Sequence, residues 1–112
     1  MDIEIYKALS DESRLRILNI LFRKELCVCE IESILNLSQT NVSRHLNKLK
    51  YSGLLSIKKE SRWVYYSINE DFIKENNYLY QHLNERFKDE NFFNEDVLRM
   101  EELEKENNLC NI

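Results

Sequence analysis

Apolar residues recur every three or four positions in the first part of the chain, which is the period of an amphipathic helix. Ser10 precedes such a series, and Asp11 and Glu12 fall in the first turn, where the helix dipole favours negative charge. This pattern predicts a helix that starts after a cap at Ser10 and buries one face: Leu15, Leu18, Leu21 and Phe22.

Two shorter helices are predicted next. Cys27 and Glu30 have the spacing of a capping box, with Cys in place of the usual Ser or Thr, and the apolar positions that follow share one helical face: Val28, Ile31, Ile34 and Leu35. Another helix is predicted from Ser38, with Gly53 as its C-terminal cap. Two short helices joined by a tight turn over residues 28–52 predict a helix-turn-helix.

The second of these helices has an apolar face and a polar face. Val42, Leu46 and Leu49 form a narrow stripe at about 100° per residue. Such a helix usually meets base edges in the major groove with its N-terminal part. His45 lies between the faces, where it would pack or contact a phosphate. We expect the polar face to contact DNA: Gln39, Thr40, Ser43, Arg44, Asn47 and Lys48.

After Gly53 the pattern changes to β-prone runs, LLSIKKE and RWVYYSI, separated by a turn. Their alternation predicts an antiparallel hairpin over residues 54–68, the wing of a winged helix-turn-helix. Its tip carries Lys58, Lys59 and Arg62, which we expect to reach the backbone or minor groove of DNA. The alternative is a solvated tip whose lysines only keep an edge strand from pairing.

Residues 69–112 are polar with helical patterning and predict two C-terminal helices. The second carries an apolar stripe from Phe93 to Leu103 on an acidic background. Packing on its own domain is the simplest explanation of the stripe, although a terminal amphipathic helix also suits a symmetric dimer on a two-fold operator. The whole chain, 1–112, is thus predicted to be one mainly α domain with a small antiparallel hairpin.

Composition supports this fold and excludes several functions. One Gly and no Pro among 112 residues favour helices, and the length suits a single core. No apolar run reaches membrane-spanning length and the N-terminus lacks the apolar centre of a signal peptide, so we expect a cytoplasmic protein without a membrane partner. Neither a glycine-rich phosphate loop nor a nucleophile and base at suitable spacing is present, so no enzyme is expected.

The net charge of −4 conceals two opposite segments. Residues 38–68 contain six basic side chains and one acidic, whereas residues 85–112 contain four basic and nine acidic. A basic segment that coincides with the helix-turn-helix and wing predicts double-stranded operator DNA as the partner.

The motif ELCVCE places Cys27 and Cys29 at a predicted helix start, and the third cysteine is Cys110. In a reducing compartment such thiols bind metal or sense redox state, or pack as small hydrophobes. Thiolates select soft ions: trivalent arsenic or antimony suits three sulfurs, and zinc or cadmium four ligands. Cys110 is a candidate third ligand or an idle thiol.

Two further expectations follow from the position of the pair. The helix N-terminus should lower the thiol pKa. Residues two apart on a regular helix point about 200° away from each other, so both sulfurs should reach one ion only if the helix start is distorted.

Four segments in this order, KALSDESRLRIL, ELCVCEIESIL, SQTNVSRHLNKLKYSGLL and RWVYYSI, resemble the ArsR/SmtB family of winged-helix metal-sensing repressors over about residues 6–68. The resemblance implies a homodimer, built by terminal helices at Ile3 to Leu9 and Phe93 to Leu103. It implies that the dimer binds operator DNA when ligand-free and releases it on binding a metal or metalloid.

ELCVC is similar to the thiolate site of the family's arsenic and antimony sensors, and of its cadmium and lead sensors. The resemblance makes Cys27 and Cys29 ligands of arsenite or antimonite, with cadmium or lead as alternatives and no organic cofactor. Glu32 stands where a third cysteine is common, and the histidines, His45 and His82, do not form the zinc sensors' pattern.

Other interpretations stay open at this point. A thiol redox or persulfide sensor on the same fold would link Cys27 or Cys29 to Cys110. A plain repressor would leave the cysteines idle, and a protein-interaction module would not bind DNA at all.

Overall fold

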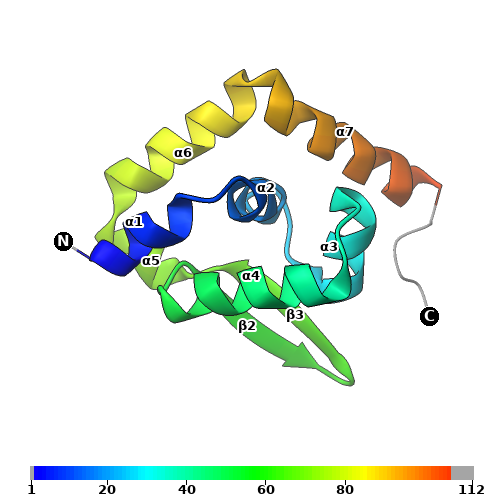
Figure 1. Cartoon of the computed structure of the whole chain (residues 1–112), viewed down its shortest axis with the longest axis horizontal. Coiled ribbons are helices and arrows are strands. Elements are labelled where there is room, and N and C mark those ends of the chain that lie inside the picture. The colour runs from blue at the N-terminus through cyan, green and yellow to red at the C-terminus, as the bar shows by residue number, and fades with distance from the viewer. Residues whose placement is uncertain (1, 107–112) are drawn as a thin grey trace.

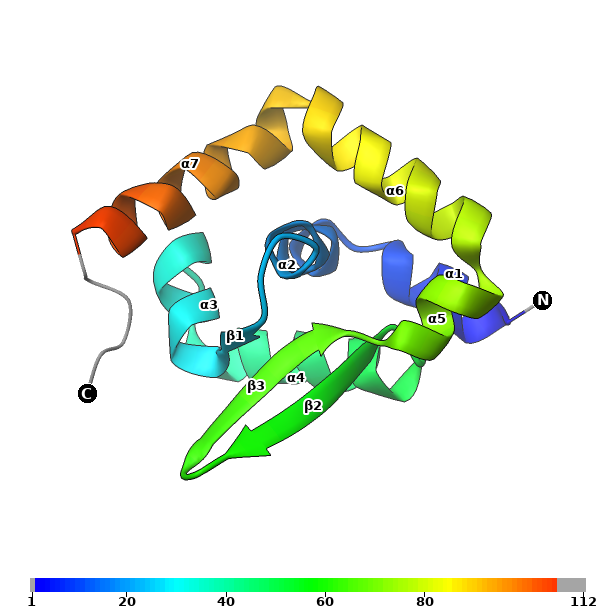
Figure 2. The same cartoon turned by 180° about the vertical axis from the view of Figure 1, so that it is seen from behind.

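Helix α2 (Glu12–Leu21) lies at the centre of the molecule, and the other helices surround it (Figure 1). The computed structural model describes residues 2–106 of the 112-residue chain. Helices α1 and α4 lie on one side of α2, and α6 and α7 form a roof on the other, bent where the two meet (Figure 1). From behind, the hairpin projects beyond α4 and α3 (Figure 2).

The remaining elements confirm a mainly α protein with a small antiparallel sheet. In chain order they are α1 (Ile3–Leu9), β1 (Leu26–Cys27), α3 (Val28–Leu35), α4 (Gln39–Tyr51), β2 (Leu55–Glu60), β3 (Trp63–Ile68), α5 (Glu70–Glu75), α6 (Asn77–Asp89) and α7 (Asn91–Lys105). Within residues 2–106, no helix has both the length and the apolar character needed to cross a bilayer.

The helix-turn-helix forms as predicted because each helix end has its own local partner. Glu30 Oε1 accepts from the backbone N–H of Cys27 at 3.0 Å, and the Cys27 side chain accepts from the Glu30 N–H, so the predicted capping box is complete. Asn36 ends α3 in the left-handed region at φ 55°, which Asn tolerates better than most residues. Ser38 Oγ then accepts from the Asn41 N–H at 3.2 Å and starts α4.

Two expectations about helix ends are wrong, and a third is confirmed. Asp11, not Ser10, caps α2, since its carboxylate accepts from the Arg14 N–H at 3.0 Å. The Ser10 hydroxyl instead donates to the Lys7 carbonyl at the end of α1. The C-terminal region holds three helices rather than two, because Asn76 leaves helical geometry at φ −128° and ψ 46° and separates α5 from α6. The predicted cap at Gly53 is confirmed: with φ 88° it donates to the Lys50 carbonyl at 3.1 Å, and Leu54 donates to the Leu49 carbonyl at 3.1 Å.

The sheet contains a strand that the sequence did not predict. The hairpin pairs as expected, from Leu55 opposite Ile68 to Glu60 opposite Trp63. β1 adds to the other edge of β3, with Cys27 opposite Tyr65, so the strand order is β1-β3-β2. A two-residue strand carries too little alternation to be recognised in sequence, but it joins the segment before α3 to the wing.

The core lies where α2, α3 and α4 meet. Aromatic rings fix the roof to α2: Phe22 lies 4.9 Å from the ring of Tyr80 and 5.1 Å from Phe87, and Phe87 lies 4.8 Å from Phe93. Aliphatic side chains with at most 1% exposure fill the space below: Ile17, Leu18, Ile20, Leu26, Ile31, Ile34, Val42, Leu46, Leu49 and Leu54. Each contributes roughly 1.5–3 kcal/mol through removal from water.

The apolar stripe of α7 packs against the core of its own subunit. Phe93 and Met100 are 6% and 5% exposed and belong to the core, so packing on its own domain is confirmed. Phe93 and Met100 are therefore covered within the subunit, and the dimer contact that the family resemblance implied for this stripe stays a prediction. The outer faces of α1 and α7 carry exposed apolar side chains instead: Ile3, Tyr6, Phe92 and Leu98.

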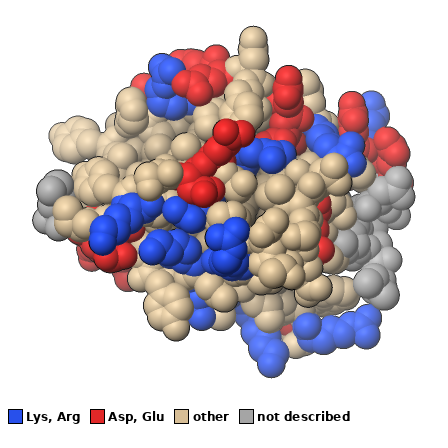
Figure 3. Space-filling view, in the orientation of Figure 1, with Lys and Arg blue, Asp and Glu red and all other residues tan. Residues whose placement is uncertain are grey.

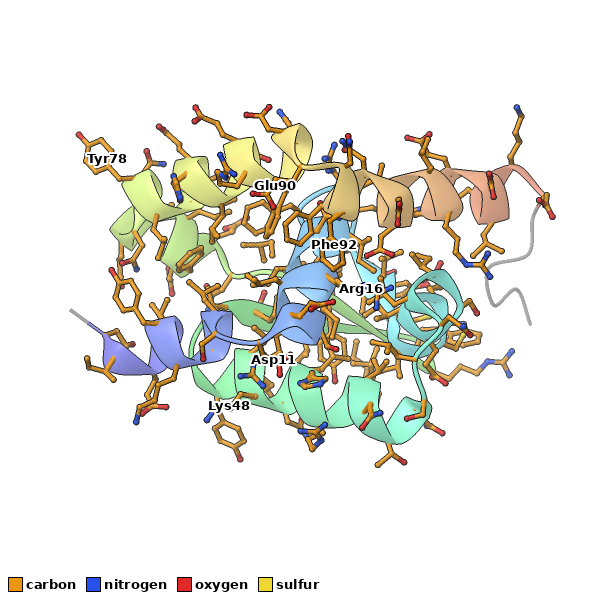
Figure 4. All side chains as sticks on the ribbon, turned by 45° about the horizontal axis from the view of Figure 1, so that its top comes forward. Asp11, Arg16, Lys48, Tyr78, Glu90 and Phe92 are labelled. Carbon is orange, nitrogen blue, oxygen red and sulfur yellow. The ribbon has the colours of Figure 1, made fainter. Side chains whose placement is uncertain are left out.

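Polar side chains on α2 also hold α7 in place. Arg16 donates from Nε and Nη2 to the two carboxylate oxygens of Asp96 at 2.9 and 3.0 Å, and from Nη2 to the Leu35 carbonyl at 3.0 Å. Figure 4 shows Arg16 between α2, α3 and the roof. Asn19, fully buried, donates to the Phe93 carbonyl at 2.8 Å. These bonds fix where α7 sits along α2.

Buried His45 on α4 is fixed by Arg14 on α2. Arg14 Nη1 lies 3.3 Å from His45 Nδ1, and because a guanidinium only donates, Nδ1 accepts and the ring is neutral with its proton on Nε2. Burial lowers the pKa of His45, Arg44 and Arg14 lower it further, and Asp11 opposes them.

We expect Asp96→Asn to lower the free energy of unfolding by roughly 2 kcal/mol, because Arg16 would keep its charge but lose the carboxylate that compensates it. Urea denaturation measures the change. Glu104→Gln is the control: Glu104 pairs with Lys24 in an exposed bridge at 3.2 Å and should cost less than about 1 kcal/mol. Equal losses in the two variants would contradict the role of Asp96.

We also expect stability to fall as the pH drops from about 7 to 5, because His45 titrates below its unfolded value of about 6.5 and the unfolded chain therefore binds the extra proton. The contribution is complete above that value and is lost on acidification. Urea denaturation at several pH values should show a flatter decline for His45→Gln than for wild type, whereas His82→Gln, at an exposed position, should follow wild type. Parallel curves for all three proteins would refute the assignment.

Candidate DNA-reading surface and thiol site

Helix α4 presents one continuous polar face to solvent. Its apolar residues Val42, Leu46 and Leu49 are fully buried, so the helical period places the opposite side outward. Five of the predicted DNA-contacting residues are exposed there: Gln39, Thr40, Arg44, Asn47 and Lys48. Lys48 points away from the body of the molecule (Figure 4). The predicted DNA-contacting face of α4 is therefore accessible at the surface.

Two of the predicted DNA-contacting residues, Ser43 and His45, are less exposed than these five. Ser43 is only partly exposed, at the margin of the face. His45 is 5% exposed and contacts Arg14, so it packs between α4 and α2. The DNA contact predicted for His45 is thus corrected in favour of its packing alternative, because 100° steps along the helix turn position 45 inward beside Leu46.

Two further residues on α4 belong to the surface and were not selected from sequence. Asn41 is exposed, and its side-chain oxygen accepts from Arg44 Nη2 at 3.3 Å, which orients the guanidinium. Tyr51, at the end of the helix, is 91% exposed. The spacing of three between Asn41 and Arg44 was the available signal for the first of these.

The wing carries the remaining predicted contacts. Lys58, Lys59 and Arg62 are all exposed. Glu60 accepts from Lys58 at 2.9 Å and raises the pKa of Lys58, so part of this charge is already compensated within the wing. Arg62 lies over the ring of Trp63, 5.3 Å from its centroid. Ser61 forms the turn at φ 58°, a conformation that glycine adopts more readily.

Basic residues of α4 and the wing share one side of the molecule. In the space-filling view, blue side chains predominate over α4 and at the wing tip, whereas the roof shows both signs (Figure 3). This distribution agrees with the charge pattern of the sequence. A basic face of this shape suits a phosphate backbone on both sides of the groove that α4 would enter.

The two cysteines of ELCVCE lie together at the start of α3. Their sulfurs are 3.8 Å apart. Cys27 is the residue before the helix and has extended backbone, with φ −90° and ψ 168°, so the angular rule for two helical residues does not apply to it. The expected distortion of the helix start is therefore not required for the sulfurs to meet.

The thiol environment also differs from expectation. Cys27 is 6% exposed, and burial raises its pKa, with the neighbouring Glu30 carboxylate contributing in the same direction. These effects exceed the lowering expected from the helix N-terminus. A buried thiol resists ionisation until a cation or another group replaces its proton.

A hollow of about 280 Å³ opens beside the cysteines. Three elements line it: the start of α3, the start of α4 and the wing. The lining residues are Cys27, Val28, Cys29, Glu32, Gln39, Arg62, Trp63 and Val64. The hollow thus brings the predicted thiol ligands next to residues of both predicted DNA-reading elements.

The described part of the chain supplies an incomplete metal site. No group of three or more His, Cys, Asp or Glu side chains within residues 2–106 is placed to hold an ion. Cys110, the candidate third ligand, lies outside the described residues. Cys27 is a free thiol and Cys29 is disulfide-bonded in the structure, so the pair is the candidate core of a metal site once Cys29 is reduced, and that site needs further ligands.

Comparison with known proteins places these features in a family. Residues 11–56 match the family model described as bacterial regulatory protein, arsR family. The arsenic resistance transcriptional regulator ArsR2 of Pseudomonas putida is 45% identical over 69 residues, which cover 61% of this chain and 60% of that protein. The cadmium resistance regulator CadC of Listeria innocua is 45% identical over 64 residues, which cover 56% and 54%. The matched segment thus spans little more than half the length of these curated relatives.

A solved structure extends the similarity to the fold. The homodimeric winged helix-turn-helix DNA-binding domain Mb0332 from Mycobacterium bovis, a possible ArsR-family transcriptional regulator, superposes with a TM-score of 0.64 at 29% identity. The superposition covers 74% of this chain and 77% of that domain. The winged helix-turn-helix predicted from sequence is confirmed, and the chain belongs to the arsR family of bacterial regulatory proteins, which are transcriptional regulators rather than enzymes.

Proposed function

We propose that this protein is a cytoplasmic repressor that binds double-stranded operator DNA as a homodimer and releases it when a thiophilic ion, arsenite or antimonite, binds Cys27 and Cys29. The observation that carries the proposal is the 3.8 Å separation of the two sulfurs at the first residues of the helix-turn-helix. The ligand site and the DNA-reading unit thereby share one helix.

The donor set fits a soft ion. Sulfur bonds to a bound ion of about 2.3 Å allow two ligands to lie up to roughly 4.6 Å apart, so sulfurs at 3.8 Å reach one ion with little movement. Thiolates favour arsenic, antimony, cadmium or lead over oxygen-seeking cations. Such an ion when bound would supply the positive charge that displaces the thiol protons. The arsenic and cadmium resistance regulators among the relatives support this ligand class.

We assign the recognition of DNA to α4 and the wing. Arg44, held by Asn41, and Lys48 lie on the exposed face of α4, and the wing tip adds Arg62. Two copies related by a two-fold axis would place two such helices on half-sites one helical turn apart. The homodimeric relative supports this assembly, and the exposed apolar side chains of α1 offer a surface for it.

Release requires that the ion bind one conformation more tightly than the other. If the DNA-bound form disfavours the occupied thiol site, the two ligands weaken each other's binding reciprocally, typically by about 1–3 kcal/mol. A shift of α3 would change the position of α4 through the tight turn between them, and so alter the register of the reading helix on DNA.

We expect Arg44→Ala to weaken binding of a duplex selected from a random-sequence library by about 1–3 kcal/mol, roughly 5- to 150-fold, through loss of a base contact. Lys48→Ala should mainly lower the dependence of log Kd on log salt by about one phosphate contact. Fluorescence anisotropy across a salt series measures both. Lys88→Ala on α6 is the matched charge control and should bind as wild type. Unchanged binding by both α4 variants would exclude α4 as the reading helix.

Arsenite or antimonite should release the same duplex from wild type, and Cys27→Ser and Cys29→Ser should abolish release while retaining DNA binding. Anisotropy titrations with arsenite, antimonite, cadmium and zinc in turn provide the measurement. Cys110→Ser identifies the third ligand: lost release makes Cys110 a ligand, and retained release makes it dispensable. Release by cadmium alone would favour a cadmium sensor, and release by oxidant without any ion would favour a thiol redox sensor; both would refute the metalloid assignment.

A further inference from the structure

The wing forms one wall of the hollow beside the thiol pair. Trp63 and Val64 come from β3 and Arg62 from the turn before it, and they line the same hollow of about 280 Å³ as Cys27 and Cys29. Gln39, the first residue of α4, also lines the hollow. A group held by the two sulfurs would therefore lie against both DNA-reading elements.

The backbone joins the same two regions. Cys27 belongs to β1 and pairs with Tyr65 of β3, two residues beyond Trp63. Cys27 is also the residue from which α3 starts, so its position is tied to the sheet on one side and to the helix-turn-helix on the other. Since antiparallel pairs hold their partners through backbone hydrogen bonds, movement of Cys27 displaces β3 as well as α3.

Trp63 lines the hollow beside the two cysteines and also contacts a basic side chain of the wing. Its side chain is partly buried, and Arg62 lies over its ring at 5.3 Å. Any change in the ring position changes the support of the Arg62 guanidinium. Arg62 is exposed at the wing tip, where it would meet phosphate or the minor groove.

We propose that Trp63 is the coupling residue between the inducer site and the wing: occupancy of the thiol pair is sensed by the Trp63 ring and by the β1–β3 pairing, and moves Arg62 away from DNA. This inference rests on the proposed function. Beside the shift of α3, it adds a second route, through the wing, by which ion binding weakens DNA binding. It also assigns the hollow as the space for whatever completes the coordination of the ion, bounded by the apolar surfaces of Val28, Trp63 and Val64.

Trp63 is the only tryptophan of the chain, so its fluorescence reports directly on this wall of the hollow. Titration of the DNA-free wild-type protein with arsenite should change the intensity or wavelength of the emission in a saturable way. Cys27→Ser and Cys29→Ser should remove the response. Protection of the cysteines from a thiol reagent establishes independently that arsenite has bound. Unchanged emission with arsenite bound would overturn the proposal, whatever the behaviour of any variant.

The second measurement separates sensing from transmission. For each protein, anisotropy gives the ratio of duplex Kd with and without saturating arsenite, which a coupling of ordinary size makes roughly 5- to 150-fold in wild type. Trp63→Leu should bind arsenite and DNA but bring this ratio close to one, and Trp63→Phe, which keeps an aromatic ring, should restore most of it. Ile57→Ala on β2 is the matched wing control: Ile57 pairs with Tyr66, lies outside the hollow and should leave the ratio at the wild-type value.

The outcomes distinguish this inference from the proposed function. If arsenite binds but does not release DNA from wild type, the arsenite-responsive function itself fails, and the coupling role fails with it. If wild type and Trp63→Leu are released to the same extent, the function stands and Trp63 is not the coupling residue. If Ile57→Ala loses release as strongly as Trp63→Leu, general weakening of the wing explains the loss and the specific role of Trp63 is overturned.

Discussion

The burial of α2 is the constraint on which the rest of the structure depends. Ile17, Leu18 and Ile20 are completely withdrawn from solvent, so elements must cover this helix on every side. The helix-turn-helix covers one side and the α6–α7 roof the other (Figure 1). Polar residues on the same helix then need partners in each layer. Arg14 meets His45 of α4, and Arg16 meets Asp96 of α7. One buried helix thereby sets the position of the reading helix and of the roof.

This arrangement divides the surface by function. The apolar face of α4 packs on the core, and its polar face is left exposed beside a basic wing. The acidic segment lies in the roof, away from the face that would meet phosphate (Figure 3). A chain of net negative charge can thus present a basic surface to DNA, because the two signs occupy different layers.

The thiol pair lies where three elements meet. Cys27 ends a strand and begins a helix, and the extended backbone at this residue turns its sulfur toward that of Cys29. The same geometry makes Cys27 part of the sheet that contains the wing. If the proposed inducer binds here, it contacts the start of α3 and, through the β1–β3 pairing, the wing.

Local sequence patterns alone were enough to predict several helix starts, the exposed face of α4 and the wing. The period of α4 identified its exposed face, Ser38 and the Cys27–Glu30 spacing located two helix starts, and β-branched and aromatic alternation identified the wing. These features depend on neighbours within a few residues, so sequence spacing suffices. Tertiary structure decided what depends on distant neighbours: the inward position of His45, the raised pKa of Cys27, the pairing of β1 with β3 and the docking of the α7 stripe on its own subunit. Burial and strand pairing depend on how distant segments assemble into layers. A short stretch of sequence therefore does not show which other segment will cover it.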